Sequence, residues 1–202
     1  MKRYIILLSL FVLQINSGHA QKNTAEILKN AYQKGFITKD KDSIYYQKVF
    51  FNAFPSDFQY FKKLYGYNDL TNKVYSYSLN GFGLDHINHF FALKCINEDT
   101  FIKKIIEISI NAKDQADGIR FFQHNLILYV PLHCKEFIKI LQTFSSNQIV
   151  YVWTFYFDYE NHFDRKEEYD KILKLTSPAY KNMTPLITMG YQRAGKRHIL
   201  PH

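Results

Sequence analysis

The sequence predicts an all-α protein, either a single-domain helical bundle or a short stack of antiparallel helical hairpins. Helix start and stop signals recur at short intervals, and apolar residues repeat with helical spacing between them. The connecting turns are brief, which favours antiparallel neighbours. The chain has no sequence repeat of fixed period, which favours a bundle over a solenoid.

Residues 1–20 have the layout of a cleavable signal peptide. Lys2 and Arg3 precede an uncharged run, Tyr4 to Ile15, and the small-residue motif Gly18-His19-Ala20 follows. The run is about a dozen residues, short of the ~20 that a membrane-spanning helix needs. We therefore expect an exported protein, periplasmic or secreted, that is cleaved near Ala20 and has no membrane span.

The remaining chain has the length of one domain, because a single core serves up to ~250 residues. We expect a helical domain at 21–189 and a basic, mobile tail at 190–202. The chain has 26 basic and 18 acidic residues, and the net charge of +8 is spread along it. Nucleic-acid binding would need denser clustering, so no nucleic acid is expected. The excess indicates a solvated surface, with an acidic protein partner as the alternative.

Helix signals divide the first half of the domain. Asn23 and Glu26 form a capping-box pattern, and Gly35 follows the last turn of the helix that they open. A proline disfavours helical geometry in the preceding residue, so a second helix from Asp42 should end before Pro55. Ser56 with Gln59 predicts a third helix, which Gly66 ends. Further helices are expected at 69–79 and 85–95, separated by a turn at 80–83.

The second half holds the clearest helical patterns, at 98–111 and from Asp114 to Val130, where Asp114 and Asp117 mark the start. Pro131 is expected at the start of a helix over 132–144, where its missing N–H costs nothing. Asp164 with Glu167 predicts a helix over 164–175. Ser177-Pro178 predicts a last helix, with a kink expected at Pro185, which interrupts the helix hydrogen bonds.

For residues 149–157, the strand propensity of the residues and the helix-capping pattern before them predict different structures. The segment is β-branched and aromatic throughout, which favours a buried strand. Ser145 and Gln148, however, form a capping box directly before it, and a lone strand would have no partner. We predict a helix, with a strand as the alternative.

Cys95 and Cys134 would lie in an oxidising compartment after export, where a disulfide can persist. Such a bridge could contribute ~3 to 4 kcal/mol by restricting the unfolded chain. Two separate buried thiols explain the same residues equally well. His133 and Cys134 are adjacent, so on a helix they point about 100° apart and do not form a nucleophile with its base.

Two histidines three residues apart, His86 and His89, face one side of a helix and could both reach a metal ion. A zinc enzyme needs a third protein ligand, which the sequence does not place. We therefore interpret them as a pair of helix-surface histidines, with metal binding as the alternative. The chain has no Gly-rich phosphate loop, nucleophile elbow or Walker lysine, so we expect no cofactor.

Two groups of residues are candidates for binding a partner. Asp117, Gln123 and His124 lie close together, and Asp117 and His124 share one helix face because they are seven residues apart. The alternative for Asp117 is a carboxylate that interacts with the helix dipole. The second group is Trp153, Tyr156, Asp158 and Tyr159. The chain has 16 tyrosines and 18 phenylalanines, more than one helical core requires, and tyrosine and tryptophan are enriched at interfaces.

Three aromatic-rich stretches carry a resemblance: FPSDFQYFKKLYGY at 54–67, Ala116 to His124, and WTFYFD at 153–158. They resemble a loosely defined group of small, often exported, helical proteins of Gram-negative bacteria, some of which act as immunity proteins against contact-dependent or type VI secreted toxins. The similarity covers about residues 45–175. It implies a helical fold and a toxin-neutralising role, in which a rigid helical face occludes the toxin.

The leading hypothesis is therefore a periplasmic immunity or inhibitor protein that binds another protein and is not an enzyme. The first alternative is a periplasmic metal-dependent hydrolase that uses the His86/His89 pair. The second is a module with an aromatic groove for a lipid or peptide. The sequence does not decide the oligomeric state.

Overall fold

A computed structural model describes residues 22–39, 41–68, 70–71, 73–75, 78–113, 117–159, 165–176 and 179–197. Within these ranges the chain consists of helices and one two-stranded sheet, which confirms the predicted all-α fold class. None of the described helices combines the length and the apolar character needed to cross a membrane.

The first helix covers residues 22–32 and continues as the π-helical turn Gln33–Ile37. The other elements are α2 (Ser43–Ala53), α3 (Phe58–Tyr65), β1 (Tyr67–Asn68), β2 (Lys73–Val74), α4 (Gly83–Phe91), α5 (Glu98–Ser109), α6 (Asp117–Leu132), α7 (Cys134–Leu141), α8 (Ser146–Phe157), α9 (Arg165–Thr176) and α10 (Thr184–Arg197). The short 3₁₀ turns Asn80–Phe82 and Lys181–Met183 precede α4 and α10.

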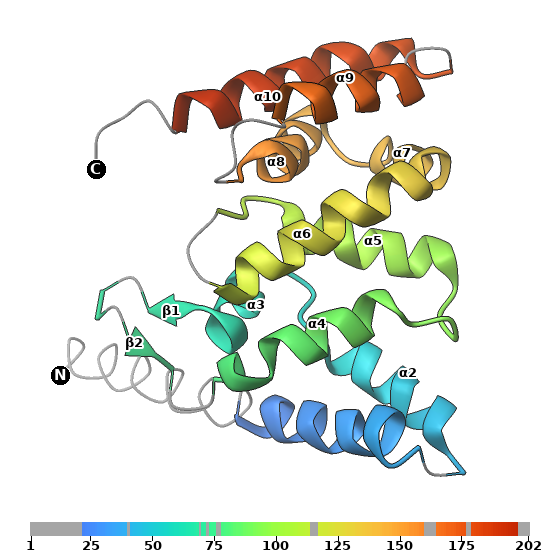
Figure 1. The fold of residues 1–202 in the computed structure, drawn as a ribbon, viewed down its shortest axis with the longest axis vertical. Coiled ribbons are helices and arrows are strands. Elements are labelled where there is room, and N and C mark those ends of the chain that lie inside the picture. Colours follow the sequence, from blue (N-terminus) through green and yellow to red (C-terminus); the bar gives the residue numbers. More distant parts are fainter. Residues whose placement is uncertain are drawn as a thin grey trace, which may run out of the picture.

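The helices form a stack along the longest axis of the molecule (Figure 1). The first helix and α2 lie at one end, α3 to α6 in the middle, and α7 to α10 at the other end. Helices α4 and α6, which are separated by α5 in the chain, run side by side in the same direction. Gly83 meets Gly118 at their starts, and Phe91 contacts Tyr129 further along, with ring centroids 5.9 Å apart.

Helix α8 confirms the helical prediction for residues 149–157. The capping box forms: the Ser145 hydroxyl accepts a hydrogen bond from the Gln148 backbone N–H, and the Gln148 side chain accepts one from the Ser145 N–H. The helix packs against α5, α6 and α10, and residues 152–157 are all buried. Its aromatic and β-branched composition therefore reflects burial on nearly all sides, which a helix and a strand would share.

The expected boundary between domain and tail at residue 190 is wrong, because α10 continues through Gly190 to Arg197. Gly190 and Ala194 are buried. At Gly190 the helix lies so close to α8 that an added Cβ would be 2.4 Å from the Trp153 Cβ. Glycine here permits a close helix contact, which outweighs its low helix propensity. Residues 198–202 of the expected tail lie outside the described residues.

The expected helix over 69–79 is also wrong. Tyr67 pairs with Val74 and Asn68 with Lys73 in an antiparallel β1–β2 ladder. The Asn68 carboxamide oxygen accepts hydrogen bonds from the backbone N–H groups of Leu70 and Thr71. This side chain closes a turn and so competes with helix formation, a common role of asparagine.

Smaller differences concern helix ends. Gly35 does not end the first helix but lies inside the π-turn, where the Gln47 amide donates a hydrogen bond to its carbonyl. The N-cap of α3 is Asp57, not Ser56, and its side chain accepts a hydrogen bond from the Tyr60 N–H. Pro131 lies in the last turn of α6 and does not start the next helix. The start signals at Asp114, Asp164 and Ser177-Pro178, and residues 1–20, lie outside the described residues.

Candidate functional site

Trp153 and Tyr156, predicted to contact a partner, are instead part of the core, each with 0% of its surface exposed. Their rings meet edge to face with centroids 5.3 Å apart. The Tyr156 hydroxyl donates a hydrogen bond to the Glu168 carboxylate at 2.5 Å, which ties α8 to α9, and burial raises the pKa of Tyr156. Asp158 is also buried, and Tyr159 is half-buried. This group therefore offers no exposed docking surface.

Gln123 is separated from the two residues predicted to act with it. It is buried, and its amide donates hydrogen bonds to the backbone carbonyls of Phe155 and Asp158, the latter at 2.9 Å. Phe155 lies in the last turn of α8 and Asp158 is its C-cap, where helix carbonyls have few backbone partners; the Phe155 carbonyl also accepts a hydrogen bond from the Asp158 N–H at 3.2 Å. Gln123 therefore joins α6 to α8 and has a structural role.

The histidine pair faces the first helix instead of solvent. The rings of His86 and His89 lie 4.5 and 5.3 Å from the Tyr32 ring. His86 is fully buried, its Nδ1 lies 3.0 Å from the Tyr65 hydroxyl, and burial lowers its pKa to about 4. His89 Nδ1 donates a hydrogen bond to the Asp85 carbonyl at 2.8 Å. The interpretation as surface histidines is therefore wrong for His86.

The described residues contain no cluster of three or more His, Cys, Asp or Glu side chains that could hold a metal ion. The cysteines are not joined in a disulfide, so the alternative of two separate thiols holds. Cys95 Sγ donates a hydrogen bond to the Gln47 side chain at 3.6 Å. Cys134 is buried at the start of α7, and burial raises the pKa of its thiol, which opposes formation of a reactive thiolate.

Two glycines place the N-terminal ends of α4 and α6 in contact. A Cβ on Gly118 would lie 2.8 Å from the Tyr65 carbonyl oxygen and 3.0 Å from the Tyr65 Cβ. A Cβ on Gly83 would lie 3.8 Å from the Gly118 Cα. The backbones can approach this closely only because position 118 has no side chain. Both helices therefore begin at the same point above Tyr65.

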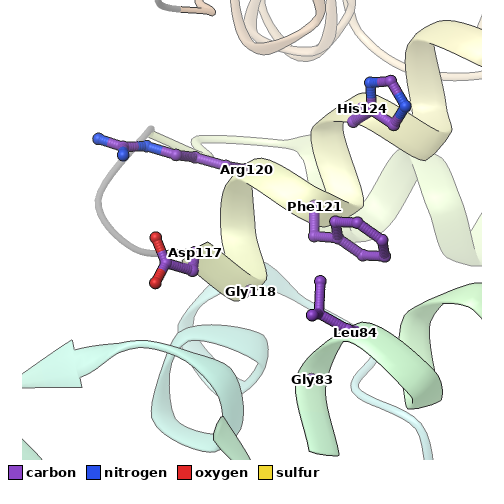
Figure 2. Close-up of a pocket in the computed structure, with 7 residues that line it drawn as sticks. All are labelled: Gly83, Leu84, Asp117, Gly118, Arg120, Phe121 and His124. Atoms are coloured by element: carbon purple, nitrogen blue, oxygen red, sulfur yellow. The ribbon is translucent and has the colours of Figure 1, made fainter.

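A groove of about 550 Å³ opens where the two helices begin (Figure 2). Its lining is Gly83, Leu84, Asp117, Gly118, Arg120, Phe121 and His124. Figure 2 shows the Phe121 ring over Leu84, with Asp117 and Arg120 extending from the start of α6 and His124 about two turns further along. The structure thus brings Asp117 and His124 to one surface, as the sequence predicted.

The outer face of α6 continues this surface beyond the groove. Leu128 and Leu132 are 57% and 82% exposed, and Leu84 at the groove is 56% exposed. Helical spacing puts Asp117, Phe121, His124, Leu128 and Leu132 in one outward stripe. We call the surface formed by this stripe and Leu84, Asn88 and Asn125 the α4–α6 face.

Charge is scarce on these two helices. Apart from histidines, their charged residues are Asp85, Asp117 and Arg120, all in the first turns. Exposed leucines without surrounding charges resemble the centre of a protein interface, where charged residues are depleted. In a chain with 44 charged residues, exposed helices are expected to carry more charged residues than these two do.

Comparisons of the chain with known protein families, curated proteins and solved structures gave no match.

The α4–α6 face is suited to binding. Asp117 and His124 are seven residues apart, about 10 Å along the helix axis, so they do not form a hydrogen-bonded acid–base pair. The groove instead offers an apolar centre, Leu84 and Phe121, bordered by an acid, a guanidinium and an imidazole. Such a site can receive one apolar side chain and orient it by polar contacts at the border.

Sequence reasoning missed the exposed leucines of this face. Helical spacing puts Ile119, Phe122, Leu126 and Val130 on one side of α6, and all four are buried. Leu128 and Leu132 lie on the opposite side of the same helix. The sequence does indicate them: a helix packs only one side against the core, so apolar residues on two opposite sides predict that one apolar side is exposed.

Proposed function

We propose that this protein is an exported, non-enzymatic binding protein that neutralises another protein, in the manner of an immunity protein against a secreted toxin, and that it docks its target through the α4–α6 face. The observation that carries the proposal is the groove with its apolar centre beside exposed leucines, on helices nearly free of charge.

The mechanism is occlusion. Tyr65, Gly83 and Gly118 fix the two helices against each other, so the groove exists before a target arrives. A preformed site loses little conformational entropy on binding. One apolar side chain of the target would fill the space between Leu84 and Phe121, while Asp117, Arg120 and His124 select the polar groups around it.

Two features support this function over catalysis. The buried His86 and Cys134 face the protein interior, and the exposed polar residues of the face are too widely spaced to act as an acid–base pair. The location is supported by two sequence features, the signal-peptide layout of residues 1–20 and the resemblance to exported immunity proteins. Both favour the periplasm.

The role is tested by a protection assay. Cells that export the product of a toxin gene adjacent to this gene are expected to survive when they also express this protein, and to die when they express the Phe121→Asp variant. A charged side chain in the groove opposes burial of an apolar anchor. The matched control is Leu70→Asp, since Leu70 is 95% exposed in the β1–β2 turn and is not part of the α4–α6 face.

Circular dichroism and the fluorescence of Trp153 establish that both variants are folded. Equal protection by Phe121→Asp and wild type would remove the α4–α6 face from the proposal. Death of cells with the wild-type protein would remove the immunity role.

Export has its own test. Residues 1–20 fused to a β-lactamase that lacks a leader should confer ampicillin resistance, because this enzyme protects cells only from the periplasm. Replacing Leu8 and Leu10 by arginine should abolish resistance, since charges interrupt the apolar run. A sensitive strain carrying the unaltered fusion would contradict export.

A further inference from the structure

The two ends of the α4–α6 face differ in shape. The groove between Leu84 and Phe121 lies at the N-terminal end of α6, and Leu132 projects at its C-terminal end with 82% of its surface exposed. Fourteen residues separate Gly118 from Leu132, which is about 21 Å along a helix. One face thus carries a groove at one end and, at the other end, an exposed leucine side chain that can enter such a groove.

The two ends also differ in charge. At the N-terminal end, Asp85 and Asp117 start the helices, with Arg120 to one side. At the C-terminal end, Lys94 follows α4, and His133 follows α6 with its Nδ1 2.9 Å from the Glu98 carboxylate. A helix N-terminus carries partial positive and a C-terminus partial negative charge, so antiparallel docking also opposes the helix dipoles favourably.

The middle of the face is polar and uncharged. Asn88 on α4 and Asn125 on α6 lie side by side, with the Asn125 amide nitrogen 3.5 Å from the Asn88 carboxamide oxygen. A carboxamide both donates and accepts hydrogen bonds, so each asparagine can pair with an identical residue.

From this arrangement we propose that the α4–α6 face docks a second copy of the same chain, antiparallel, about a two-fold axis that passes through Asn88 and Asn125. In that register Leu132 of each copy enters the groove of the other, beside Leu84 and Phe121. Asp85 faces Lys94 of the second copy. The contact is isologous and closes on itself, as in most homodimers.

The second copy is favoured as occupant because its chemistry matches at three separate places: leucine to groove, asparagine to asparagine, and Asp85 to Lys94. The inference concerns the site of the proposed function and adds its regulation. In a dimer each groove is closed, so a target must displace the second copy. Its test needs no target, and the two proposals can therefore fail separately.

The test is the mass of the purified full-length gene product, measured by analytical ultracentrifugation between about 1 and 200 µM. We expect a reversible dimer. Leu132→Asp should weaken dimerisation by at least about 100-fold, because the change removes two leucine contacts per dimer at roughly 1.5 kcal/mol or more each. Leu70→Asp, which alters an equally exposed leucine outside the face, should dimerise like wild type.

A charge exchange tests the antiparallel register. Asp85→Lys and Lys94→Asp should each weaken the dimer severalfold, and the double variant should recover the wild-type dissociation constant. Both side chains are exposed, so the exchanges leave the fold intact. Circular dichroism confirms this for each variant.

A protein that stays monomeric at 200 µM overturns the proposal. A dimer that tolerates Leu132→Asp also overturns it, because the contact would then use another surface. A dimer that requires Leu132 but ignores the charge exchange overturns the antiparallel arrangement.

Discussion

Replacing Gly190 by alanine is expected to destabilise the protein although alanine favours helices. A Cβ at this position would lie 2.4 Å from the Trp153 Cβ, 2.9 Å from the Trp153 carbonyl carbon and 3.0 Å from the Thr154 nitrogen. Carbon atoms in contact are normally about 3.5–4.0 Å apart, so α10 must move away from α8 by roughly 1 Å or more. The opposing atoms are backbone and Cβ atoms, which cannot rotate aside.

The magnitude follows from two opposing effects. Overpacking of this kind costs about 1–3 kcal/mol, and the upper end applies because backbone atoms are involved. The change from glycine to alanine in a helix stabilises the helix by up to about 1 kcal/mol, because alanine has the higher helix propensity. We therefore expect Gly190→Ala to lower the free energy of unfolding by about 2 kcal/mol.

Gly195→Ala is the matched control in the same helix. Its Cβ would meet only the end of the Arg165 side chain, at 3.4 Å, and that side chain can move. This variant should be unchanged or up to about 1 kcal/mol more stable.

The assay is urea denaturation followed by tryptophan fluorescence. Trp153 is the single tryptophan of the chain, so the signal arises at the contact that the mutation disturbs. Circular dichroism should give the same transition midpoint if unfolding is two-state. If Gly190→Ala were as stable as Gly195→Ala, the close packing of α10 on α8 would be refuted.

Three further predictions concern polar side chains that are buried or half-buried. Burial lowers the folded-state pKa of His86 from 6.5 to about 4, so the free energy of unfolding should fall by about 3 kcal/mol as the pH drops from 6.5 to 4. In His86→Phe, urea denaturation at a series of pH values should show a much smaller fall over this range. An equally large loss of stability in the variant would show that His86 is not its cause. Gln123→Leu removes the side-chain donor to the Phe155 and Asp158 carbonyls and should cost about 2 kcal/mol by urea denaturation, whereas His124→Ala, its exposed neighbour, should change stability by less than about 0.5 kcal/mol. Equal effects would argue against the bridging role. Lys104 donates hydrogen bonds to the Phe51 and Phe54 carbonyls at 2.6 and 2.9 Å, so Lys104→Met should lower the melting temperature through a loss of about 2 kcal/mol, while Lys103→Met, whose partner Glu107 is 3.9 Å away at the surface, should have almost no effect.

Features set by neighbouring residues could be predicted from the sequence. Ser145 and Gln148 cap α8 through contacts that span three residues, and this local signal correctly outweighed the strand propensity of the segment. The hairpin at 67–74 was missed, because the turn-forming hydrogen bonds of Asn68 were not weighed against the helical pattern.

Features that depend on a distant partner could not be predicted. Gly190 reads as a flexible residue until α8 is placed beside it, and Trp153 reads as a docking residue until α10 covers it. His86 and His89 do share one side of a helix, but the sequence does not say that this side faces Tyr32. Asp117 and His124 were found because their spacing alone puts them on one face. Their apolar neighbour Leu84 comes from another helix, so no spacing rule connects it to them.

The glycine contact between α4 and α6 gives the two walls of the groove unequal freedom to evolve. Position 118 must be glycine, since any side chain there would collide with the buried Tyr65. Gly83 has only ordinary contacts at 3.7 and 3.8 Å, so a methyl group fits without displacing its neighbours. Substitutions at position 83 can therefore change the shape of the groove without disturbing the fold, whereas position 118 must stay glycine for the two helices to keep their contact.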